Sequence, residues 1–373
     1  MFRFQVGKHL CKDAPRVWYN RNMKILVVGS GSSEHALIEA LRKSDLCDEI
    51  FCAPGNGGIS SVATCVDISP KDTGALCDFA QKEGIGFTFT CSHVPIQNDI
   101  ADRFESVGLK ILAPGAETVR SLLHAEKTAA LCEDAGVSFD LSAEGDIRRI
   151  LCLADGRDML IFPQTVSYDT LFDNDEGPAS GSMGAVCAPS VNAYPENRLR
   201  TLVTEPLMRS LRKNGIPLSG MMGLKVSGSP SEPVFRGFDM HVSGAVLSVI
   251  LKRLECDLLG LMLSASDGLL SGTKPAFNSL SAVSVMIICS RRITEPQKLV
   301  LPSEGGVSIY HSHTVETEDG LMASGRKVVV VCSDAKKLET ARSNVYNAIS
   351  TMSFPGMYFR SDIARGMGNA SKR

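Results

Sequence analysis

The sequence predicts an α/β protein that begins with a doubly wound parallel sheet. Between residues 23 and 114, short apolar runs alternate with helical patterns, and glycine-rich turns follow the first two of those runs. Later segments mix strand and helix patterns without this regular alternation, which is typical of α+β domains. The 373 residues suffice for two or three domains.

The elements of the first domain follow from periodicity and turn residues. Apolar residues at 36, 37, 40 and 41 have helical spacing, and Gly84 stands just past the end of the second helical pattern. Strands are expected within 24–29, 49–58, 85–90 and 109–115, and helices within 33–44, 72–84 and 98–108. The loops at 29–34, 54–58 and 91–96 would then gather at the carboxyl ends of the strands, where such sheets bind ligands.

The rest of the chain is predicted to form two further domains. We expect a helix over 115–137, one helix and one strand within 138–172, a helix over 195–213, a hairpin over 220–242 and a helix over 246–266. Residues 267–281 indicate a linker, and strands at 282–290, 306–312 and 325–333 with a helix at 335–350 indicate a small α+β domain. The expected domains are therefore 23–114, 115–270 and 282–365, after an extension of residues 1–22.

Composition argues against several classes of protein. A net charge of −2 provides no basic field for nucleic acid, and no apolar run approaches the roughly 18 residues of a membrane span. Twelve cysteines without a C-x-x-C pair predict reduced thiols in a cytoplasmic protein. Residues 1–22 are basic, which fits either a mitochondrial transit peptide or a disordered tail ahead of a true start at Met23.

Two glycine-rich loops are candidates for a phosphate site. In "GSGSSE" (29–34) the sixth position is Glu34, whose carboxylate disfavours a nicotinamide cofactor but leaves room for a single phosphate at the helix N-terminus. "APGNGG" (53–58) follows the next strand and would lie beside it, so Glu34 and His35 could meet the amine or hydroxyls of a phosphorylated ligand. An ordinary tight turn and a helix-capping His35 are the alternatives.

The segment "DNDEGPASGSMG" (173–184) is acidic at its start and rich in small residues at its end. Its carboxylates could hold a metal or an amine, and its glycines would let the backbone approach a ligand closely. A solvent-exposed Gly/Ser loop is the alternative.

Four motifs in order resemble one family. "MKILVVGSGSSEHALI", "APGNGG", "DNDEGPASGSMGAVCAPS" and "MYFRSDIARG" are similar to signatures of the phosphoribosylamine–glycine ligases, ATP-grasp enzymes of purine synthesis. In that family ATP, with Mg²⁺ or Mn²⁺, activates glycine for attack by phosphoribosylamine. The resemblance implies an ATP-grasp α+β domain in the middle of the chain, those cofactors and substrates, and a monomer or homodimer.

The resemblance also implies binding residues. The phosphoribosylamine site would comprise Gly29, Gly31, Glu34, His35, Pro54, Gly55, Asn56 and Gly58. The substrate loop would comprise Asp173, Gly177, Pro178, Gly181, Met183 and Gly184.

The chain departs from the family where ATP and metal would bind. The family's metal strand carries Glu and Asn two positions apart, and these places hold Gly237 and Asp239, so Asp239 alone remains as a candidate ligand. The interval 138–167 is too short for the lobe that covers ATP, which needs on the order of 70 residues. Two interpretations follow. The chain is a working ligase whose ATP site is built from unusually few residues, or it is an inactive relative that binds a sugar phosphate or acts as a scaffold. Because phosphoryl transfer depends on positioned charge, the departures favour impaired catalysis.

Overall fold

The computed structural model describes residues 3–5, 18–20, 22–142, 147–302 and 305–367. Of the extension 1–22, strands β1 (Arg3–Gln5) and β2 (Trp18–Asn20) pair antiparallel. The buried Tyr19 hydroxyl donates to Asp267 Oδ2 at 2.9 Å, so residues 18–20 are attached to the folded protein. The predicted transit peptide or disordered tail otherwise lies outside the described residues.

The first sheet is entirely parallel and confirms the doubly wound prediction. Its order is β5-β4-β3-β6-β7. The strands are β3 (Met23–Gly29), β4 (Cys47–Pro54), β5 (Thr64–Cys65), β6 (Phe87–Phe89) and β7 (Ile111–Leu112), and the helices are α1 (Ser32–Leu41), α2 (Thr73–Glu83), α3 (His93–Gln97) and α4 (Ile100–Ser106). Val27 packs in one core with Leu37 of α1, and its neighbour Val28 packs in another with Leu76 of α2. Both faces of β3 are therefore covered by helices, as its unbroken apolar run requires.

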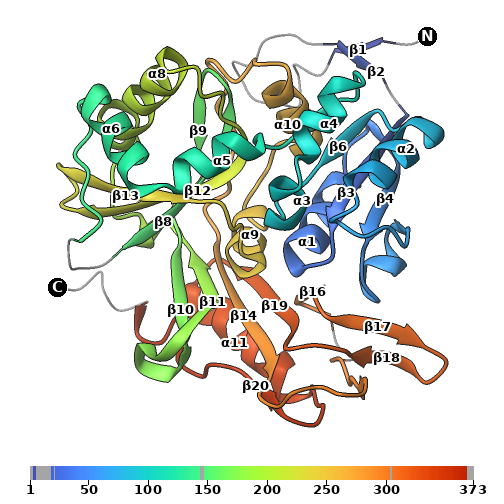
Figure 1. The fold of residues 1–373 in the computed structure, drawn as a ribbon. Coiled ribbons are helices and arrows are strands. Elements are labelled where there is room, and N and C mark those ends of the chain that lie inside the picture. The colour runs from blue at the N-terminus through green and yellow to red at the C-terminus, as the bar shows by residue number, and fades with distance from the viewer. Residues whose placement is uncertain (1–2, 6–17, 21, 143–146, 303–304, 368–373) are drawn as a thin grey trace.

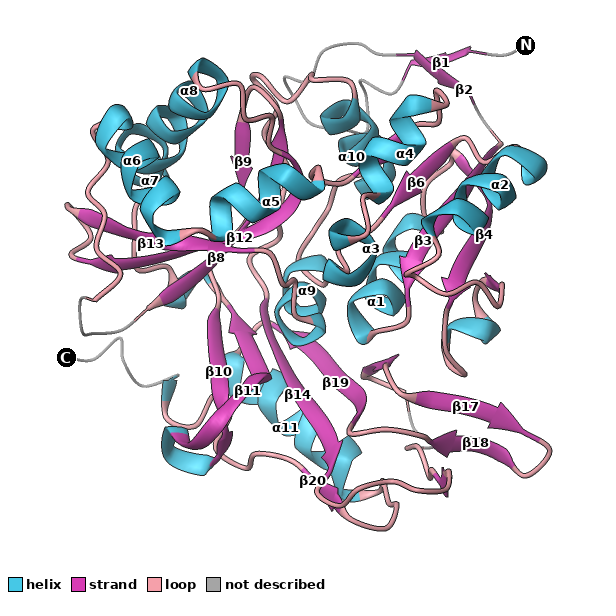
Figure 2. Ribbon diagram, viewed as in Figure 1, coloured by secondary structure: helices cyan, strands magenta, loops and turns pink. Residues whose placement is uncertain are grey.

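The second sheet is antiparallel, with the order β13-β12-β8-β9. Its strands are β8 (Arg148–Asp155), β9 (Met159–Ile161), β12 (Ser219–Gly228) and β13 (Pro233–Asp239). One face packs against α5 (Ala116–Leu123), α6 (Ala125–Ala135), α7 (Glu196–Leu199), a π-helical turn (Arg200–Thr204) and α8 (Glu205–Lys213), as Figure 2 shows. The predicted hairpin over 220–242 is present, although its second strand ends at Asp239.

Two predictions for the central region are wrong. The single helix over 115–137 is two helices, because His124 takes an extended conformation with ψ of 115°. Within 138–172 the described residues form three strands and no helix, since the apolar runs there pair with β12 and with a third sheet. Periodicity alone cannot distinguish short buried strands from helix segments.

The third sheet has the order β10-β11-β14-β19-β16, with β20 paired to β14. Its strands are β10 (Val166–Phe172), β11 (Glu176–Cys187), β14 (Ser281–Cys289), β16 (Ser308–His311), β19 (Lys327–Ala335) and β20 (Met357–Tyr358), and α11 (Leu338–Ser350) packs on one face. A small sheet of β15 (Gln297–Lys298), β17 (Thr314–Thr317) and β18 (Gly320–Ala323) extends beneath the first sheet (Figure 1). Since β11 pairs with β14, this sheet contains strands from both sides of the predicted linker, and the domain division stays a prediction.

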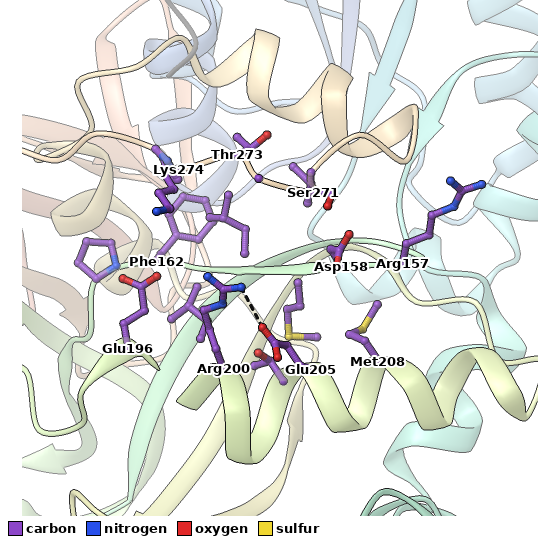
Figure 3. Close-up of a pocket in the computed structure, with 18 of the residues that line it drawn as sticks. Arg157, Asp158, Phe162, Glu196, Arg200, Glu205, Met208, Ser271, Thr273 and Lys274 are labelled. Atoms are coloured by element: carbon purple, nitrogen blue, oxygen red, sulfur yellow. Dashed lines mark hydrogen bonds and ion pairs between the residues drawn. The ribbon is translucent and has the colours of Figure 1, made fainter. Parts of the chain in front are cut away.

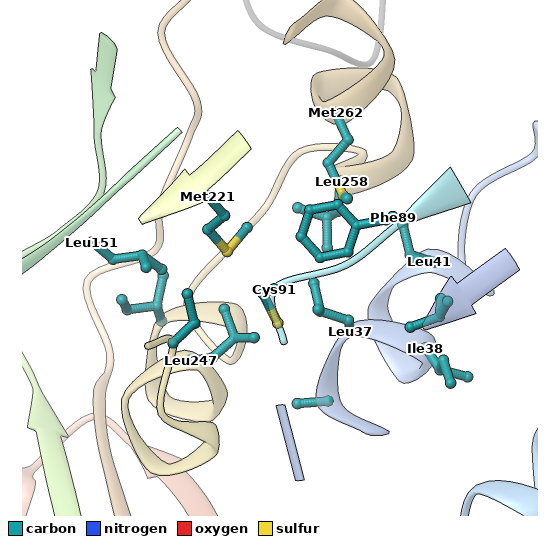
Figure 4. Close-up of a cluster of buried hydrophobic side chains, with 14 of the residues drawn as sticks. Leu37, Ile38, Leu41, Phe89, Cys91, Leu151, Met221, Leu247, Leu258 and Met262 are labelled. Atoms are coloured by element: carbon teal, nitrogen blue, oxygen red, sulfur yellow. The ribbon is translucent and has the colours of Figure 1, made fainter. Parts of the chain in front are cut away.

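Two apolar helices fill the space between the sheets. Helices α9 (Gly244–Leu251) and α10 (Leu258–Ser266) are almost wholly buried, and Figure 4 shows Leu247 near Leu151 and Met221, and Met262 near Phe89. The predicted helix over 246–266 is therefore interrupted. It restarts at α10, where Asp257 accepts a hydrogen bond from Gly260 N at 3.2 Å. Within the described residues, no helix combines the length and apolar character needed to cross a membrane.

Candidate functional site

The two glycine-rich loops lie side by side, as the parallel topology predicts. Gly55 N donates to Gly29 O at 3.2 Å, and Asn56 Nδ2 donates to Ser30 O at 2.9 Å. Pro54 at the end of β4 lies opposite Gly29 at the end of β3. The expected ends of both strands thus meet at one edge of the first sheet.

Glu34 folds back onto the start of its own helix. Its Oε2 accepts from Gly31 N at 2.7 Å and from Ser33 Oγ at 3.2 Å, and its Oε1 accepts from the Cys91 thiol at 3.4 Å. The side chain is only 3% exposed and lies over Gly29, where a Cβ would be 2.6 Å from Glu34 Cδ. These contacts give Glu34 a helix-capping role. Contact with a ligand amine stays a prediction that they do not favour.

His35 is buried against the third sheet. Its Nδ1 accepts from His311 N at 2.9 Å, and the two imidazole rings lie 5.4 Å apart. Burial lowers the pKa of His35 to about 3, and the neighbouring His311 adds to this effect; burial likewise lowers the pKa of His311 to about 4. His35 is therefore a neutral hydrogen-bond acceptor at the interface between the first sheet and β16.

The loop 54–58 is occupied by contacts within the chain. Asn56 Oδ1 accepts from Gly58 N and Ile59 N, both at 2.9 Å, and Asn56 Nδ2 also donates to His311 O at 2.9 Å. A Cβ at Gly58 would lie 2.1 Å from the His311 ring, and one at Gly55 would lie 2.3 Å from Cys65 Sγ. The glycines of this loop are therefore needed for close packing, chiefly against the segment that contains His311.

Helix α9 covers the start of α1. A Cβ at Gly244 would lie 2.1 Å from Ser32 Oγ and 2.8 Å from Ser33 N, and Ser32 N donates to Ser312 Oγ at 3.0 Å. The amides of Gly31 and Ser32 thus already have acceptors within the chain. A phosphate at this helix N-terminus stays a prediction, and it would have to displace those acceptors.

The acidic loop between β10 and β11 is held by the C-terminal motif "MYFRSDIARG". Asp173 accepts from Ser361 N at 2.8 Å and also from Ser361 Oγ. The fully buried Arg360 binds Asp175 Oδ1 at 2.9 Å. Two of the motifs that carry the family resemblance are therefore one structural unit.

The other residues of this loop have separate surroundings. Pro178 is exposed, Met183 is buried in the core, and Gly181 accepts a hydrogen bond from Lys327 Nζ at 3.2 Å. Gly177 lies against Phe172, and Gly184 packs tightly against β14 and Ile363. Of these residues only Gly181 borders the cavity described next.

A cavity of about 240 Å³ lies between the second and third sheets and contains Asp239. Its polar lining comes from β8, β10, β11, β12, the end of β13 and the segment after it: Arg149, Ser167, Asp169, Ser182, Lys225, Asp239, His241 and Ser243. Arg149 Nε donates to Asp239 Oδ2 at 2.7 Å, and its Nη1 forms a close ion pair with Asp169. A guanidinium thus joins the two carboxylates of this cavity.

These residues do not fit a divalent metal ion. Gly237 offers no side chain, and the cation that faces Asp239 is Arg149. Among the described residues no three or more His, Cys, Asp or Glu side chains are grouped so that they could hold a metal. Burial lowers the pKa of the neighbouring His241, and Lys327 adds to that effect.

Comparison with known proteins decides the family. Three domain models of phosphoribosylglycinamide synthetase match in order: the N domain over residues 23–120, the ATP-grasp (A) domain over 116–231 and the C domain over 290–366. The chain belongs to the phosphoribosylglycinamide synthetase family. The predicted family and fold class are therefore confirmed, including the ATP-grasp domain in the middle of the chain.

Relatives in this family are distant but cover the chain. The phosphoribosylamine–glycine ligase of Caldanaerobacter subterraneus is 25% identical, over 92% of this chain and all of the relative. The chloroplastic enzyme of Arabidopsis thaliana is also 25% identical, over 88% of this chain and 77% of its own. The crystal structure of the Thermotoga maritima ligase superposes with a TM-score of 0.77 at 16% identity, over 91% of this chain and all of that one, which shows the shared fold.

The alignment also shows a shortening. It is 420 positions long with the Caldanaerobacter ligase, whereas 92% of 373 residues is about 343, so about 77 positions have no counterpart here. In the structure, the connection between α6 and β8 is short. Only residues 136–147 connect α6 to β8, and the described ones among them form no helix or strand.

Sequence reasoning missed Arg149 and Asp169. Both belong to the 138–172 segment, which was expected to hold only one helix and one strand, so neither could be assigned to a sheet face. In the sheet, Arg149 pairs with Lys225, and Lys225 pairs with Gly237. Two residues along each strand, Leu151 pairs with Gly223 and Gly223 pairs with Asp239, so Arg149 and Asp239 lie in neighbouring rows. An arginine at the start of an apolar strand was the available signal.

Proposed function

We propose that this chain keeps the fold of the phosphoribosylamine–glycine ligases but does not ligate glycine at an enzymatic rate. The observation that carries the proposal is the Arg149 guanidinium between Asp169 and Asp239. It places a fixed positive charge where the family resemblance implies a metal ion. By the same resemblance its ligands, if any survive, are glycine, phosphoribosylamine and ATP, bound by a monomer or homodimer.

Electrostatics supports the proposal. Mg²⁺ is held by oxygen ligands in near-octahedral geometry and tolerates little loss of them. At Asp239 the carboxylate is already neutralised by an arginine that cannot lose its proton, and a second cation nearby would be repelled. Phosphoryl transfer relies on positioned positive charge on the reacting phosphates, and Arg149 is bound to carboxylates.

The short connection between α6 and β8 supports it independently. A lobe that covers ATP needs on the order of 70 residues. Only twelve residues, 136–147, lie between α6 and β8. A nucleotide on this sheet would face water, whose high dielectric weakens the contacts that stabilise the transferring phosphoryl group.

The test is an assay with phosphoribosylamine, glycine, ATP and Mg²⁺ that follows ADP and glycinamide ribonucleotide together, with the Thermotoga maritima ligase in parallel. We expect product from the Thermotoga enzyme and none above background from this chain. Turnover in the usual range of roughly 1–10³ s⁻¹ would contradict the proposal.

Two variants examine the cause. Arg149→Gln removes the guanidinium that joins Asp169 and Asp239, so calorimetry at about millimolar Mn²⁺ should detect binding that the parent lacks, still without turnover. Gly237→Glu alone should restore neither Mn²⁺ binding nor turnover, because Arg149 remains and because φ of +114° at Gly237 strains any side chain. Mn²⁺ binding by the parent protein at Asp239 would show that Arg149 does not take the metal's place.

A further inference from the structure

A second cavity, of about 500 Å³, shares no lining residue with the Asp239 cavity. Its walls come from β9, from the helical segment 196–212 and from the loop 270–277, and we name it the β9 groove. Figure 3 shows the helical segment along one side and Ser271, Thr273 and Lys274 along the other. Its volume is in the range of roughly 300–1,000 Å³ that small-molecule sites occupy.

The β9 groove carries an excess of positive charge. Six cationic side chains line it, against three carboxylates: Arg157, Arg200, Arg209, Arg212, Arg253 and Lys274 against Asp158, Glu196 and Glu205. Within the described part of the chain, Arg200 is the one of the six that has an ion-pair partner, Glu205 at 2.8 Å. The protein as a whole has a charge of −2, so this excess is local and does not form an extended field for a polyanion.

Arg253 adds a buried positive charge to the wall of this groove. It is only 5% exposed, and its donors reach neutral groups: Nε and Nη2 donate to Asn278 O at 3.2 and 2.8 Å, and Nη1 donates to Cys187 Sγ at 3.2 Å. None of the described carboxylates pairs with it. Burial of an ionised group without a counter-charge is costly, and an anion in the groove would offset that cost.

The floor of the groove is apolar and aromatic. The rings of Phe162 and Phe277 meet edge to face with centroids 6.0 Å apart. Phe277 is half-buried, whereas Phe162 is buried, as are the other apolar lining residues Leu160, Met208 and Leu270. In Figure 3, Arg200 and Lys274 point from opposite sides toward the part of the groove that holds Phe162. A flat apolar group beside a phosphate matches this combination of ring edges and cations.

The helical segment has an irregularity at the same place. Residues Arg200–Thr204 form a π-helical turn between α7 and α8, and both Arg200 and Thr204 line the groove. Such turns cost regular helical hydrogen bonding and are frequent at functional sites.

We propose that the β9 groove binds a small organic phosphate, that is, a phosphate group carried on a flat aromatic moiety. The phosphate lies between Arg200 and Lys274 with Arg253 behind it, and the aromatic part packs against the half-buried Phe277, beside the buried Phe162. This site is independent of the ligase fold's Asp239 cavity and of the proposed loss of ligation.

Isothermal titration of the full-length protein with 1-naphthyl phosphate tests the proposal. We expect saturable binding that weakens at least tenfold in the double variant Arg200→Gln/Lys274→Gln. The double variant Arg292→Gln/Lys336→Gln removes two exposed cations elsewhere and should bind like the parent. Lys225→Gln alters the Asp239 cavity and should also bind like the parent.

Ligand comparisons identify the chemistry. 1-Naphthol and inorganic phosphate should each bind at least tenfold more weakly than 1-naphthyl phosphate, because each lacks half of the proposed contacts. Arg253→Met should also abolish binding. Because Arg253 is buried, the test depends on the double variant of the exposed residues Arg200 and Lys274. The proposal is overturned by no binding at millimolar 1-naphthyl phosphate, by an unchanged Kd in Arg200→Gln/Lys274→Gln, by loss of binding in Lys225→Gln, or by equal binding of either comparison ligand.

Discussion

Replacing Arg360 should be among the most destabilising single changes in this protein. Its side chain is 0% exposed, and its Nε and Nη2 donate to Asp362 Oδ1 and Oδ2 at 2.8 and 2.6 Å. Nη1 binds Thr170 Oγ1 at 2.8 Å, and the guanidinium lies 4.9 Å from the Tyr168 ring centroid. Burial alone would raise the pKa of Asp362, but the bonds from Arg360 hold it at about 2. Arg360→Met removes all of these contacts and leaves Asp362 without its counter-charge.

The expected cost is about 3–5 kcal/mol, the range for breaking a buried ion pair by removing one partner. Most of it comes from Asp362, because Asp175 is largely exposed and can be solvated. Urea unfolding monitored by far-UV circular dichroism measures the change in midpoint. Arg365→Met is the matched control: Arg365 is exposed in the same motif, its side chain bonds to Ser361 alone among the described residues, and its loss should cost less than about 0.5 kcal/mol.

The result that refutes this reasoning is an Arg360→Met protein within about 1 kcal/mol of the parent. Water would then have to reach Asp362 readily, or the acidic loop would have to be anchored by Ser361 alone. The double variant Arg360→Met/Asp362→Asn separates the two terms, because it removes the stranded charge and should recover part of the loss.

Further predictions concern the interface between the first sheet and β16. The folded pKa values of His35 and His311 (about 3 and 4) lie below the usual 6.5, so the unfolded chain binds more protons below that pH. The free energy of unfolding should therefore be greatest above about pH 6.5. It should fall as the pH drops from 6.5 toward the folded pKa values, by at most about 2.7 kcal/mol per pH unit. Urea midpoints between pH 7 and pH 4 measure this; a slope unchanged in His35→Gln would count against it, and exposed His313→Gln is the control. Gly58→Ala should cost about 1–3 kcal/mol, since the new methyl group meets the His311 ring, and a thermal melt equal to the parent's would show that the ring moves aside freely. Asn56→Ala should lower the melting temperature in the same assay, because it removes an acceptor for two amides and a donor to two carbonyls; an unchanged melt would mean that water replaces those bonds.

Much of the first domain could be predicted because its signals are local. The apolar run at 24–29 and the helical spacing after it specify a strand and a helix without any distant contact. Gly84 adopts φ of +68° just past α2, as a glycine at that position predicts. Parallel topology then places successive glycine loops at one edge, and Gly55 does meet Gly29.

Helix lengths in the centre could not be predicted as well. The patterns over 115–137 and 246–266 predict continuous helices, but the first is interrupted at His124 and the second between Leu251 and Leu258. Near the second break, Arg253 turns its side chain to Asn278 and Cys187, residues that lie 25 and 66 positions away. A periodicity window cannot detect a partner at that separation.

By itself, the sequence determined the family and the fold class, because these depend on which residues stand in which order. Only the tertiary structure decided what the remaining groups do. Asp239 accepts a hydrogen bond from Arg149, 90 positions away in the sequence, and Glu34 accepts one from Gly31 N at the start of its own helix. Gly58 leaves space for the His311 ring. A residue type limits the bonds that a side chain can make, but the partner that receives them depends on how distant strands are brought together by the packing of the core.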